Sequence, residues 1–512
     1  MTGVQTCALP IYGSRLRRHR QPALLPRQHA DALRRRQAVC GKHREGAVGE
    51  QRGALTVTFM EGPGRYRRAF EWRLTPGDRE ATSVAAGGLV SLFSSEMPEV
   101  LEDYLSISRK RRNNRLALAR LQAHLLDELS VAESTIKHYK AKKKELEDSS
   151  ETEQTASAQG LHGDDLKLVN RELFLWRAFS NVIRAIADGI AWRALDFDRA
   201  VLRALCQNRG SQTVNTPGTV EELREWSRQF DYGDGIAILN SLTNWLTYGD
   251  VTVVNNDGSV TVSEVKSSKT NSNRVVRQKQ KLREVVTFLS SGKGLLEGKT
   301  VEVRTVDLVP ENGLDALCSL LQQTDEVPGY SSERISNSVY VECVDFRVAR
   351  GEWEAQLTKR RESAIADWID SNDHVHTSKS LDHLGFSPNM APFTIFPFPP
   401  TLCIDLLTAA KAYVVFLNVT AIAREFRHRG WEVETMPLDV IRSGNLEEDF
   451  MTVKKERFHV TLPPAVFMRM QMELLRPKVV IRQCELLRRA GPGSFTSDFG
   501  LPIFEHEREI WD

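Results

Sequence analysis

The sequence lacks several features that identify common classes of protein. Its seven cysteines are scattered, and no two lie within four residues of each other, which excludes a paired-cysteine zinc half-site. No apolar run reaches the roughly 18 residues that a membrane span needs. No phosphate-binding glycine loop, dinucleotide fingerprint or nucleophile elbow appears, so nothing indicates ATP, NAD or a hydrolase triad. We therefore expect a cytoplasmic protein that uses neither a membrane nor these cofactors.

The overall charge is also too small to indicate a polycation. The 512 residues carry a formal net charge of +2, with 41% hydrophobic and 27% charged residues, which is typical of a globular protein. Any surface that binds nucleic acid must then be a local patch. The length allows two to four domains, each with its own core.

The first 54 residues differ from the rest. Residues 1–11 resemble a peptide translated from sequencing-adapter DNA, and residues 15–52 contain ten arginines with little apolar periodicity. We interpret residues 1–54 as an artefact or a disordered basic tail.

Patterning divides the remainder into four segments. The pattern of residues 55–148 predicts a strand hairpin followed by a helical module. We interpret the lysine-rich end of this module as a solvated helix end. Residues 149–160 are polar and small, which predicts a linker. Residues 161–325 predict the central domain, with helices at 166–207, 220–230 and 236–246. Residues 326–337 predict a polar boundary, and residues 338–512 a mixed α/β domain. The predicted fold class is therefore α/β.

The most informative stretch lies at residues 248–266. Two short β-branched runs surround Asn256-Asp257-Gly258, a strong hairpin signal. With a three-residue loop and Gly258 in the left-handed conformation, Asp250 falls opposite Glu264, and cross-strand neighbours lie about 5 Å apart. Lys266 follows on the same face of the strand. A two-residue loop would send the two acids to opposite faces.

Two carboxylates and an ammonium group on one face suit a hard divalent cation. Mg²⁺, with Mn²⁺ as the alternative, would bind Asp250 and Glu264 through oxygen and activate a water molecule. Lys266 would hold that water or offset charge on a phosphate.

A basic helix is predicted directly after this stretch, at residues 271–290. Seven basic residues and no acid occur between Lys266 and Arg283. Such a helix would contact a phosphate backbone, although a solvated basic helix remains the simpler alternative. The predicted nucleic-acid-binding residues are Lys269, Arg274, Arg277, Gln278, Lys279, Gln280 and Lys281.

This order of elements resembles the PD-(D/E)xK nuclease superfamily, which has the restriction-endonuclease-like fold. The resemblance covers about residues 235–309 and implies that Asp250 and Glu264 are metal-binding acids and Lys266 the catalytic lysine. Gln278 or Gln280 would match the helix glutamine of some members. It further implies DNA cleavage by metal-activated water and, by extrapolation from the family's habits, a role in prokaryotic restriction or phage defence.

Two departures from the family pattern accompany the resemblance. Many members carry a Glu on the helix before the sheet, and the predicted helix at 236–246 has none, so Asn240, Asn244, Asp234 and Glu172 are alternatives for that place. The usual strand before the Asp-bearing one is also not evident.

The alternative function is a non-catalytic nucleic-acid-binding or scaffold protein on a decayed nuclease fold. RNA remains open beside DNA as the substrate, and a homo-oligomer is compatible with the sequence.

Overall fold

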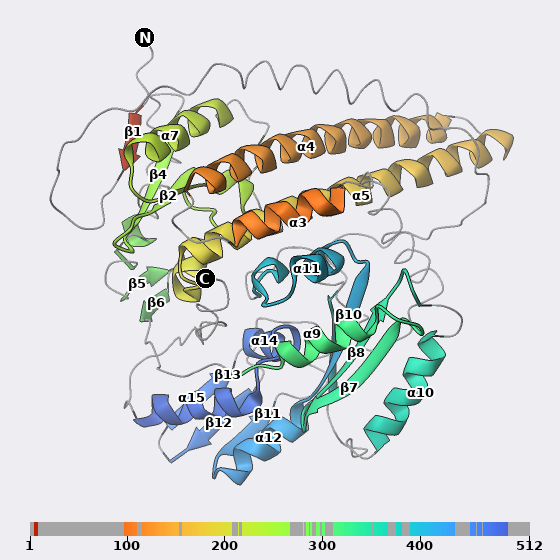
Figure 1. Cartoon of the computed structure of the whole chain (residues 1–512), viewed down its shortest axis with the longest axis vertical. Coiled ribbons are helices and arrows are strands. Elements are labelled where there is room, and N and C mark those ends of the chain that lie inside the picture. Colours follow the sequence, from red (N-terminus) through yellow and green to blue (C-terminus); the bar gives the residue numbers. More distant parts are fainter. Residues whose placement is uncertain are drawn as a thin grey trace.

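In a computed structural model, the chain combines long helices with two larger and two smaller antiparallel sheets (Figure 1). The residues that the structure describes are 5–8, 97–109, 115–152, 156–206, 213–214, 218–266, 280, 283–285, 287–288, 293–296, 299–302, 311–349, 353–366, 375–380, 390–435, 451–456, 458–462 and 464–489.

Three helices form the first part of the described chain: α3 (Met97–Ser108), α4 (Arg115–Thr152) and α5 (Ala156–Ala194). Leucines of α4 recur at helical spacing and are buried: Leu118, Leu121, Leu125 and Leu129. Each such leucine contributes about 1.5–3 kcal/mol through burial. As a result α4 and α5 pack side by side as a long antiparallel pair (Figure 1).

The linker expected at 149–160 falls largely on these two helices. Helix α4 continues to Thr152 and α5 begins at Ala156, so the polar and small residues of this segment extend the helices. The helical module expected within residues 55–148 contains two helices, because α3 ends at Ser108 and α4 begins at Arg115.

The first sheet has the strand order β1-β4-β3-β2 and is antiparallel throughout. Helices α6 (Arg199–Ala204) and α7 (Thr219–Tyr232) precede its central strands, and α7 packs on the sheet. The strands are β1 (Gln5–Ala8), β2 (Ile236–Leu239), β3 (Val251–Val254) and β4 (Val260–Lys266).

The prediction of a helix at 236–246 is wrong. This segment forms strand β2 and the short 3-10 helix η2 (Asn240–Leu242), and β2 pairs with β3. It therefore supplies the strand before the Asp-bearing one that the sequence did not reveal. Helix α7, confirmed over the predicted range of 220–230, is then the helix that precedes the sheet.

Gln122 of α4 occupies the outer edge of β2. Its side-chain Nε2 donates to Ala237 O at 2.9 Å, and its Oε1 accepts from Leu239 N at 2.9 Å. The buried side-chain amide thus pairs with an edge strand in the way another backbone would.

The second large sheet has the order β7-β8-β10-β9 and is also antiparallel. Strands β8 and β10 are buried along their whole length, which explains their nearly continuous apolar sequence. Strand β7 takes up most of the range 326–337, so this polar segment is part of the sheet, and the domain boundary placed there stays a prediction. The strands are β7 (Tyr330–Ser336), β8 (Val339–Asp345), β9 (Val375–Lys379) and β10 (Lys411–Asn418).

Helices cover both faces of this second sheet and join it to the C-terminal part of the chain (Figure 1). They are α9 (Leu314–Gln323), α10 (Trp353–Ala366), η4 (Phe393–Ile395), α11 (Pro400–Leu407), α12 (Val419–His428), α14 (Pro464–Met472) and α15 (Pro477–Arg489).

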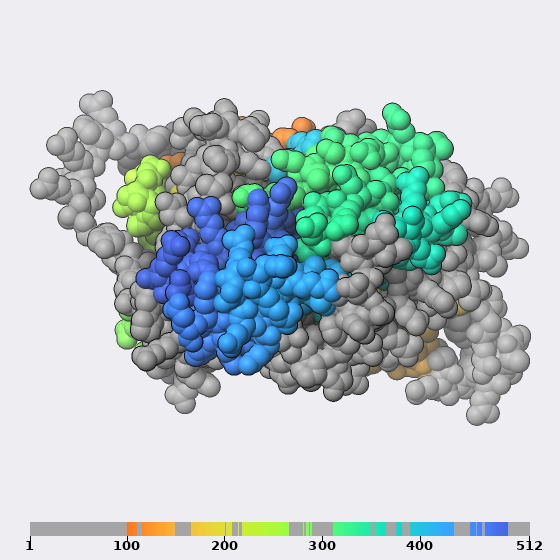
Figure 2. Space-filling view, turned by 90° about the horizontal axis from the view of Figure 1, so that it is seen from below, coloured from red at the N-terminus to blue at the C-terminus, as the bar shows by residue number. Residues whose placement is uncertain are grey.

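Two smaller sheets complete the architecture. Strands β11, β12 and β13 form one, and β5 and β6 the other. Seen from below, the residues of β7 and α9 lie beside those of the C-terminal helices and strands (Figure 2), and Gly313 N donates to Leu474 O at 3.0 Å. The strands are β5 (Lys293–Leu296), β6 (Lys299–Glu302), β11 (Glu432–Thr435), β12 (Met451–Lys455) and β13 (Phe458–Leu462).

One hydrophobic core connects these parts. It runs without interruption from Leu101 of α3 to Cys484 of α15. The buried Arg109 adds a polar link, because its guanidinium donates to the carbonyl oxygens of Thr394, Phe396 and Phe398. Among the described helices, none is both long and apolar enough to cross a membrane.

Candidate active site

The hairpin predicted around residues 256–258 is present. Val251 pairs with Ser263 and Val254 with Val260, which is the predicted register. The loop closes with Asn255 N donating to Ser259 O at 2.9 Å, and Gly258 has a φ of +82°. The three-residue loop and its left-handed glycine are therefore confirmed.

The pairing changes at Asp250. Its backbone N donates to Ser263 O at 2.8 Å, although Ser263 is already the partner of Val251 in the register. Two residues of one strand thus share one residue of the other, which is the arrangement of a β-bulge. The expectation that Asp250 lies directly opposite Glu264 is wrong, because this extra residue shifts the backbone.

The bulge nevertheless keeps Asp250 against the strand of Glu264. Its Oδ2 accepts from the backbone N of Val265 at 2.5 Å. Glu264 is half-buried next to Val265, and Lys266 is the last residue of β4, where it pairs with Gln5 of β1. The side chain of Lys266 lies outside the described residues. The structure therefore brings the Asp250 carboxylate to the end of β4 that carries Glu264.

Asn240 holds the backbone on the other side of Asp250. Its backbone N donates to Asp250 O at 3.0 Å, and its Nδ2 donates to Tyr248 O at 2.7 Å. Gly249, between these two acceptors, has a φ of +69°. The turn that leads into β3 is fixed from η2, so Asn240 positions Asp250.

Helix α7 contributes two acids that the sequence analysis did not single out. Glu222 and Glu225 lie three residues apart and are both buried against the sheet, with Glu225 only 5% exposed. They were missed because the segment 236–246 was assigned to a helix, which hid the place of α7 directly before the sheet. An acidic pair at helical spacing before a strand was the available signal.

Glu225 is held in its ionised form. Burial alone would raise its pKa, but hydrogen bonds from Arg228 and Gln229 outweigh this and keep the pKa of Glu225 below its usual value. The Arg228 guanidinium donates to both carboxylate oxygens, at 2.6 and 2.8 Å. The nearby Ser263 hydroxyl also lowers the pKa of Glu225 slightly, although its oxygen forms no hydrogen bond among the described residues.

Glu222 lies in a less polar environment. Burial raises its pKa, and only the hydroxyl of Ser241 counteracts this. Its Oε2 has no hydrogen-bond partner among the described residues, and the same holds for the Oδ1 of the neighbouring Asn240. Unpartnered oxygens therefore lie on the side of the site formed by α7 and η2.

The four alternatives for the helix glutamate have other positions. Asn240 binds the turn before β3, and Asn244 donates from its backbone and side chain to Asp188 of α5 at 2.7 and 2.8 Å. Asp234 is exposed after α7, and Glu172 belongs to the outer half of α5. None of the four lies on α7, the helix that precedes the sheet and carries the buried Glu225.

The predicted nucleic-acid-binding helix falls mostly outside the described residues. Of the seven predicted contacts, only Gln280 is described; it is exposed, and its Nε2 donates to Glu284 Oε1 at 3.0 Å. The others lie outside the described part of the chain: Lys269, Arg274, Arg277, Gln278, Lys279 and Lys281.

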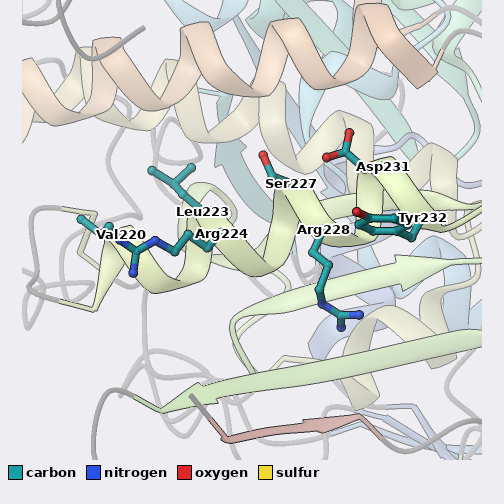
Figure 3. Close-up of a pocket in the computed structure, with 7 residues that line it drawn as sticks. All are labelled: Val220, Leu223, Arg224, Ser227, Arg228, Asp231 and Tyr232. Atoms are coloured by element: carbon teal, nitrogen blue, oxygen red, sulfur yellow. The ribbon is translucent and has the colours of Figure 1, made fainter. Parts of the chain in front are cut away.

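The outward face of α7 forms an open groove of about 440 Å³ (Figure 3). Figure 3 shows Arg228 directed from the helix toward the strands, whereas Ser227 and Asp231 point the other way. The groove therefore lies beside the site, and Arg228 connects the two through its bonds to Glu225.

The kinds of donor around Asp250 suit a hard cation. They are carboxylates and unpartnered amide and carboxyl oxygens, which magnesium and manganese prefer. Over the described ranges, no group of three or more His, Cys, Asp or Glu side chains is arranged to hold a metal ion. A Mg²⁺ site at Asp250 and Glu264 therefore stays a prediction.

Comparisons with models of protein families, with curated proteins and with solved structures give no match for this chain.

Proposed function

We propose that the chain is a metal-dependent nuclease that hydrolyses phosphodiester bonds in DNA on a restriction-endonuclease-like core. The β3–β4 hairpin carries the proposal. Its register and left-handed loop glycine bring the Asp250 carboxylate against the strand of Glu264 and Lys266, under a helix with buried acids.

Each residue has a distinct role in this proposal. Asp250 and Glu264 would hold Mg²⁺ or Mn²⁺, which when bound supplies Lewis-acid polarisation of the phosphodiester. Lys266 would offset the negative charge that builds up on the phosphate. Glu225, ionised at neutral pH, would accept a hydrogen bond from the attacking water and so orient it toward phosphorus.

Cleavage of supercoiled and linear DNA, with Mg²⁺ and with a chelator, tests this function. The parent chain should cut only with the metal. Asp250→Ala and Lys266→Ala should each reduce the cleavage rate by about a thousandfold or more, because each removes charge stabilisation from the transition state.

DNA binding by both variants, measured with chelator present, is the control and should stay within about threefold of the parent, since most affinity comes from phosphate contacts elsewhere. Variants that cut like the parent would refute the nuclease assignment.

A non-catalytic nucleic-acid-binding protein on the same fold is the second candidate. One observation favours it: the Asp250 carboxylate already accepts a backbone hydrogen bond, which is a structural use of that side chain. In that case the parent chain would bind DNA, and no divalent cation would produce cleavage.

A further inference from the structure

The loop between β2 and β3 leads the backbone into the candidate active site. It begins with η2 and ends at Asp250, directly before β3. Asn240 binds both Asp250 O and Tyr248 O, so the start and the end of the loop are tied to each other. The position of Asp250 therefore depends on where this loop lies as a unit.

A row of three buried residues on α5 faces this loop. Arg184, Asp188 and Trp192 recur at every fourth position, and each is at most 3% exposed. This spacing places them on successive turns of one helix face. Helix α5 contacts both β2 and η2, so the row lies at the start of the loop.

The two outer members of the row hold different parts of the loop. The Arg184 guanidinium donates to Ser241 O at 2.7 Å and forms an ion pair with Glu133 of α4 at 3.0 Å. The ring of Trp192 packs edge-on against the ring of Trp245, with 5.0 Å between the ring centroids. The loop is thus attached to α5 at two points three to four residues apart.

The central member, Asp188, makes the most contacts with the loop. Its Oδ1 accepts from the backbone N of Asn244 at 2.7 Å and from that of Trp245 at 3.3 Å, and its Oδ2 accepts from Asn244 Nδ2 at 2.8 Å. Nearer to Asp250, Leu205 O accepts from Thr247 N at 2.9 Å. One carboxylate therefore fixes both the backbone and a side chain in the middle of the loop.

We propose that Asp188 is a positioning residue that sets the place of Asp250 in the candidate active site. It holds the loop, and the loop holds the Asp250 carboxylate at the backbone N of Val265. The inference rests on the proposed function, because it concerns the reaction at that carboxylate. A displacement of about 1 Å at a reacting group can lower a rate by roughly a hundredfold, so a small movement of the loop would be measurable.

An exchange of donor and acceptor between Asp188 and Asn244 tests this role. In Asp188→Asn one N–H group meets another N–H of the loop, whichever way the new amide is turned, and in Asn244→Asp two carboxylates meet. The two changes combined restore one donor and one acceptor. Assays are run at pH 8, because burial raises the pKa of Asp188 to about 7.

Cleavage of linear duplex DNA with Mg²⁺ gives the first measurement. Each single variant should lower kcat by roughly a hundredfold and leave KM within about threefold of the parent. The combined variant should recover kcat to within about fivefold of the parent, since the two losses are not additive. All proteins are compared at a temperature at which circular dichroism shows them folded.

Asp345→Asn provides the matched control. Asp345 is also a buried carboxylate, 1% exposed, and it accepts from the backbone N and the guanidinium of Arg347, each at 2.8 Å, at the end of β8. This variant should lower the Tm but leave kcat within about twofold of the parent. An equal loss of kcat in the control would mean that any damaged buried carboxylate slows the reaction, and it overturns the positioning role.

Hydrogen exchange tests the same role without any cleavage. The amides of Asn240 and Asp250 bond to Asp250 O and Ser263 O, not to Asp188. If Asp188 positions the loop, both amides should exchange roughly tenfold faster or more in each single variant and return toward the parent rate in the combined variant.

The two measurements separate this inference from the nuclease proposal. Unchanged exchange in the single variants, faster exchange with an unchanged kcat, or no recovery in the combined variant overturns the positioning role. A parent chain that does not cleave DNA rejects the nuclease, and the exchange rates alone then confirm or refute that Asp188 positions Asp250.

Discussion

Glu342 lies in the middle of β8, where its side chain is 1% exposed. Neither carboxylate oxygen has a hydrogen-bond partner among the described residues, and the nearest cation is Arg361 of α10, at 3.7 Å from Oε2. Burial raises the pKa of Glu342 to about 7, and Arg361 only partly opposes this. Folding therefore favours the protonated carboxyl, whose ordinary pKa is 4.5.

This shift predicts a loss of stability as the pH rises. The contribution of the neutral carboxyl is fully present below about pH 4.5 and is lost as the pH rises through about 7. The difference between the ordinary and the raised pKa of Glu342 corresponds to about 3 kcal/mol. Glu342→Gln should therefore raise the Tm clearly at pH 8 and hardly at pH 4. Thermal unfolding at both pH values measures the change in Tm. An equal gain in Tm at pH 4 and pH 8 would contradict the raised pKa of Glu342.

A second buried acid titrates in the same range and must be separated from Glu342. Burial raises the pKa of Asp188 to about 7, against the hydrogen bonds from Asn244 and Trp245. It is unchanged in the Glu342 variant, so the difference between the two proteins reports Glu342 alone.

Residue types alone predicted only part of the candidate site. Asp250, Glu264 and Lys266 could be recognised because they belong to one hairpin whose turn is encoded locally. The bulge at Asp250 could not, because it depends on Asn240 holding the backbone from another element. Glu225 depends on α7 packing across the sheet, which requires knowing that β2 is a strand.

At the scale of elements, β2 shows why the spacing of apolar residues predicted a helix where a strand forms. Apolar residues at 236, 238, 239, 242, 245 and 246 also satisfy a helical period. The extended form is stabilised by distant partners: Gln122 binds β2, and Asp188 accepts from the backbone of Asn244 and Trp245. These contacts join residues more than 50 positions apart, so the periodicity of a segment of about ten residues cannot reveal them.

The turn between η2 and β3 gives a prediction at this scale. At Gly249 the φ is +69°, and a Cβ would lie 2.5 Å from Val262 Cγ1 and 2.8 Å from Ser263 O. Gly249→Ala should therefore lower the free energy of unfolding by about 2–4 kcal/mol, from backbone strain and overlap together. Urea unfolding measures the change.

Gly258 provides the matched control for this substitution. Its φ is +82°, but a Cβ there would meet nothing within 4 Å. Gly258→Ala should cost about 1–2 kcal/mol, from backbone strain alone. Equal costs at the two glycines would mean that the close approach at Gly249 contributes nothing.

At the scale of the whole molecule, a buried ion network joins the helices before the first sheet to the C-terminal part. Glu473, which follows α14, accepts from Arg199 of α6 at 2.5 Å, from Arg469 at 2.9 Å and from Ala391 N at 3.0 Å. All three charged side chains are at most 5% exposed. Although burial opposes it, the two arginines hold the pKa of Glu473 below its usual value.

Glu473→Gln should consequently destabilise the whole chain. It leaves two buried guanidinium groups without their counter-charge, which costs about 3–5 kcal/mol. Calorimetry should show one transition at a lower temperature, because a single core spans both parts. Two separated transitions, only one of them shifted, would instead mean that the parts unfold independently.

The mixed α/β class was predictable at this scale, and the division into domains was not. Helices and buried strands follow from periodicity, as in α9, β8 and β10. The proposed ranges 161–325 and 338–512 remain a prediction. The core that crosses them is accompanied by contacts between residues more than 200 positions apart: Arg199 pairs with Glu473, and Thr394 Oγ1 donates to Ala185 O at 2.8 Å.

The amide of Gln122 has a consequence for the chain in solution. Bare peptide groups along the rim of a sheet invite a strand from a neighbouring molecule, and here a single side chain already satisfies the rim at Ala237 and Leu239. Leucine in its place would fill a similar volume and leave Leu239 N unbonded, while Ala237 O would keep the bond that it accepts from Trp226 Nε1 at 3.1 Å. We expect such a protein to keep its hairpin but to aggregate on warming, so one carboxamide protects the edge of the sheet that carries the candidate site.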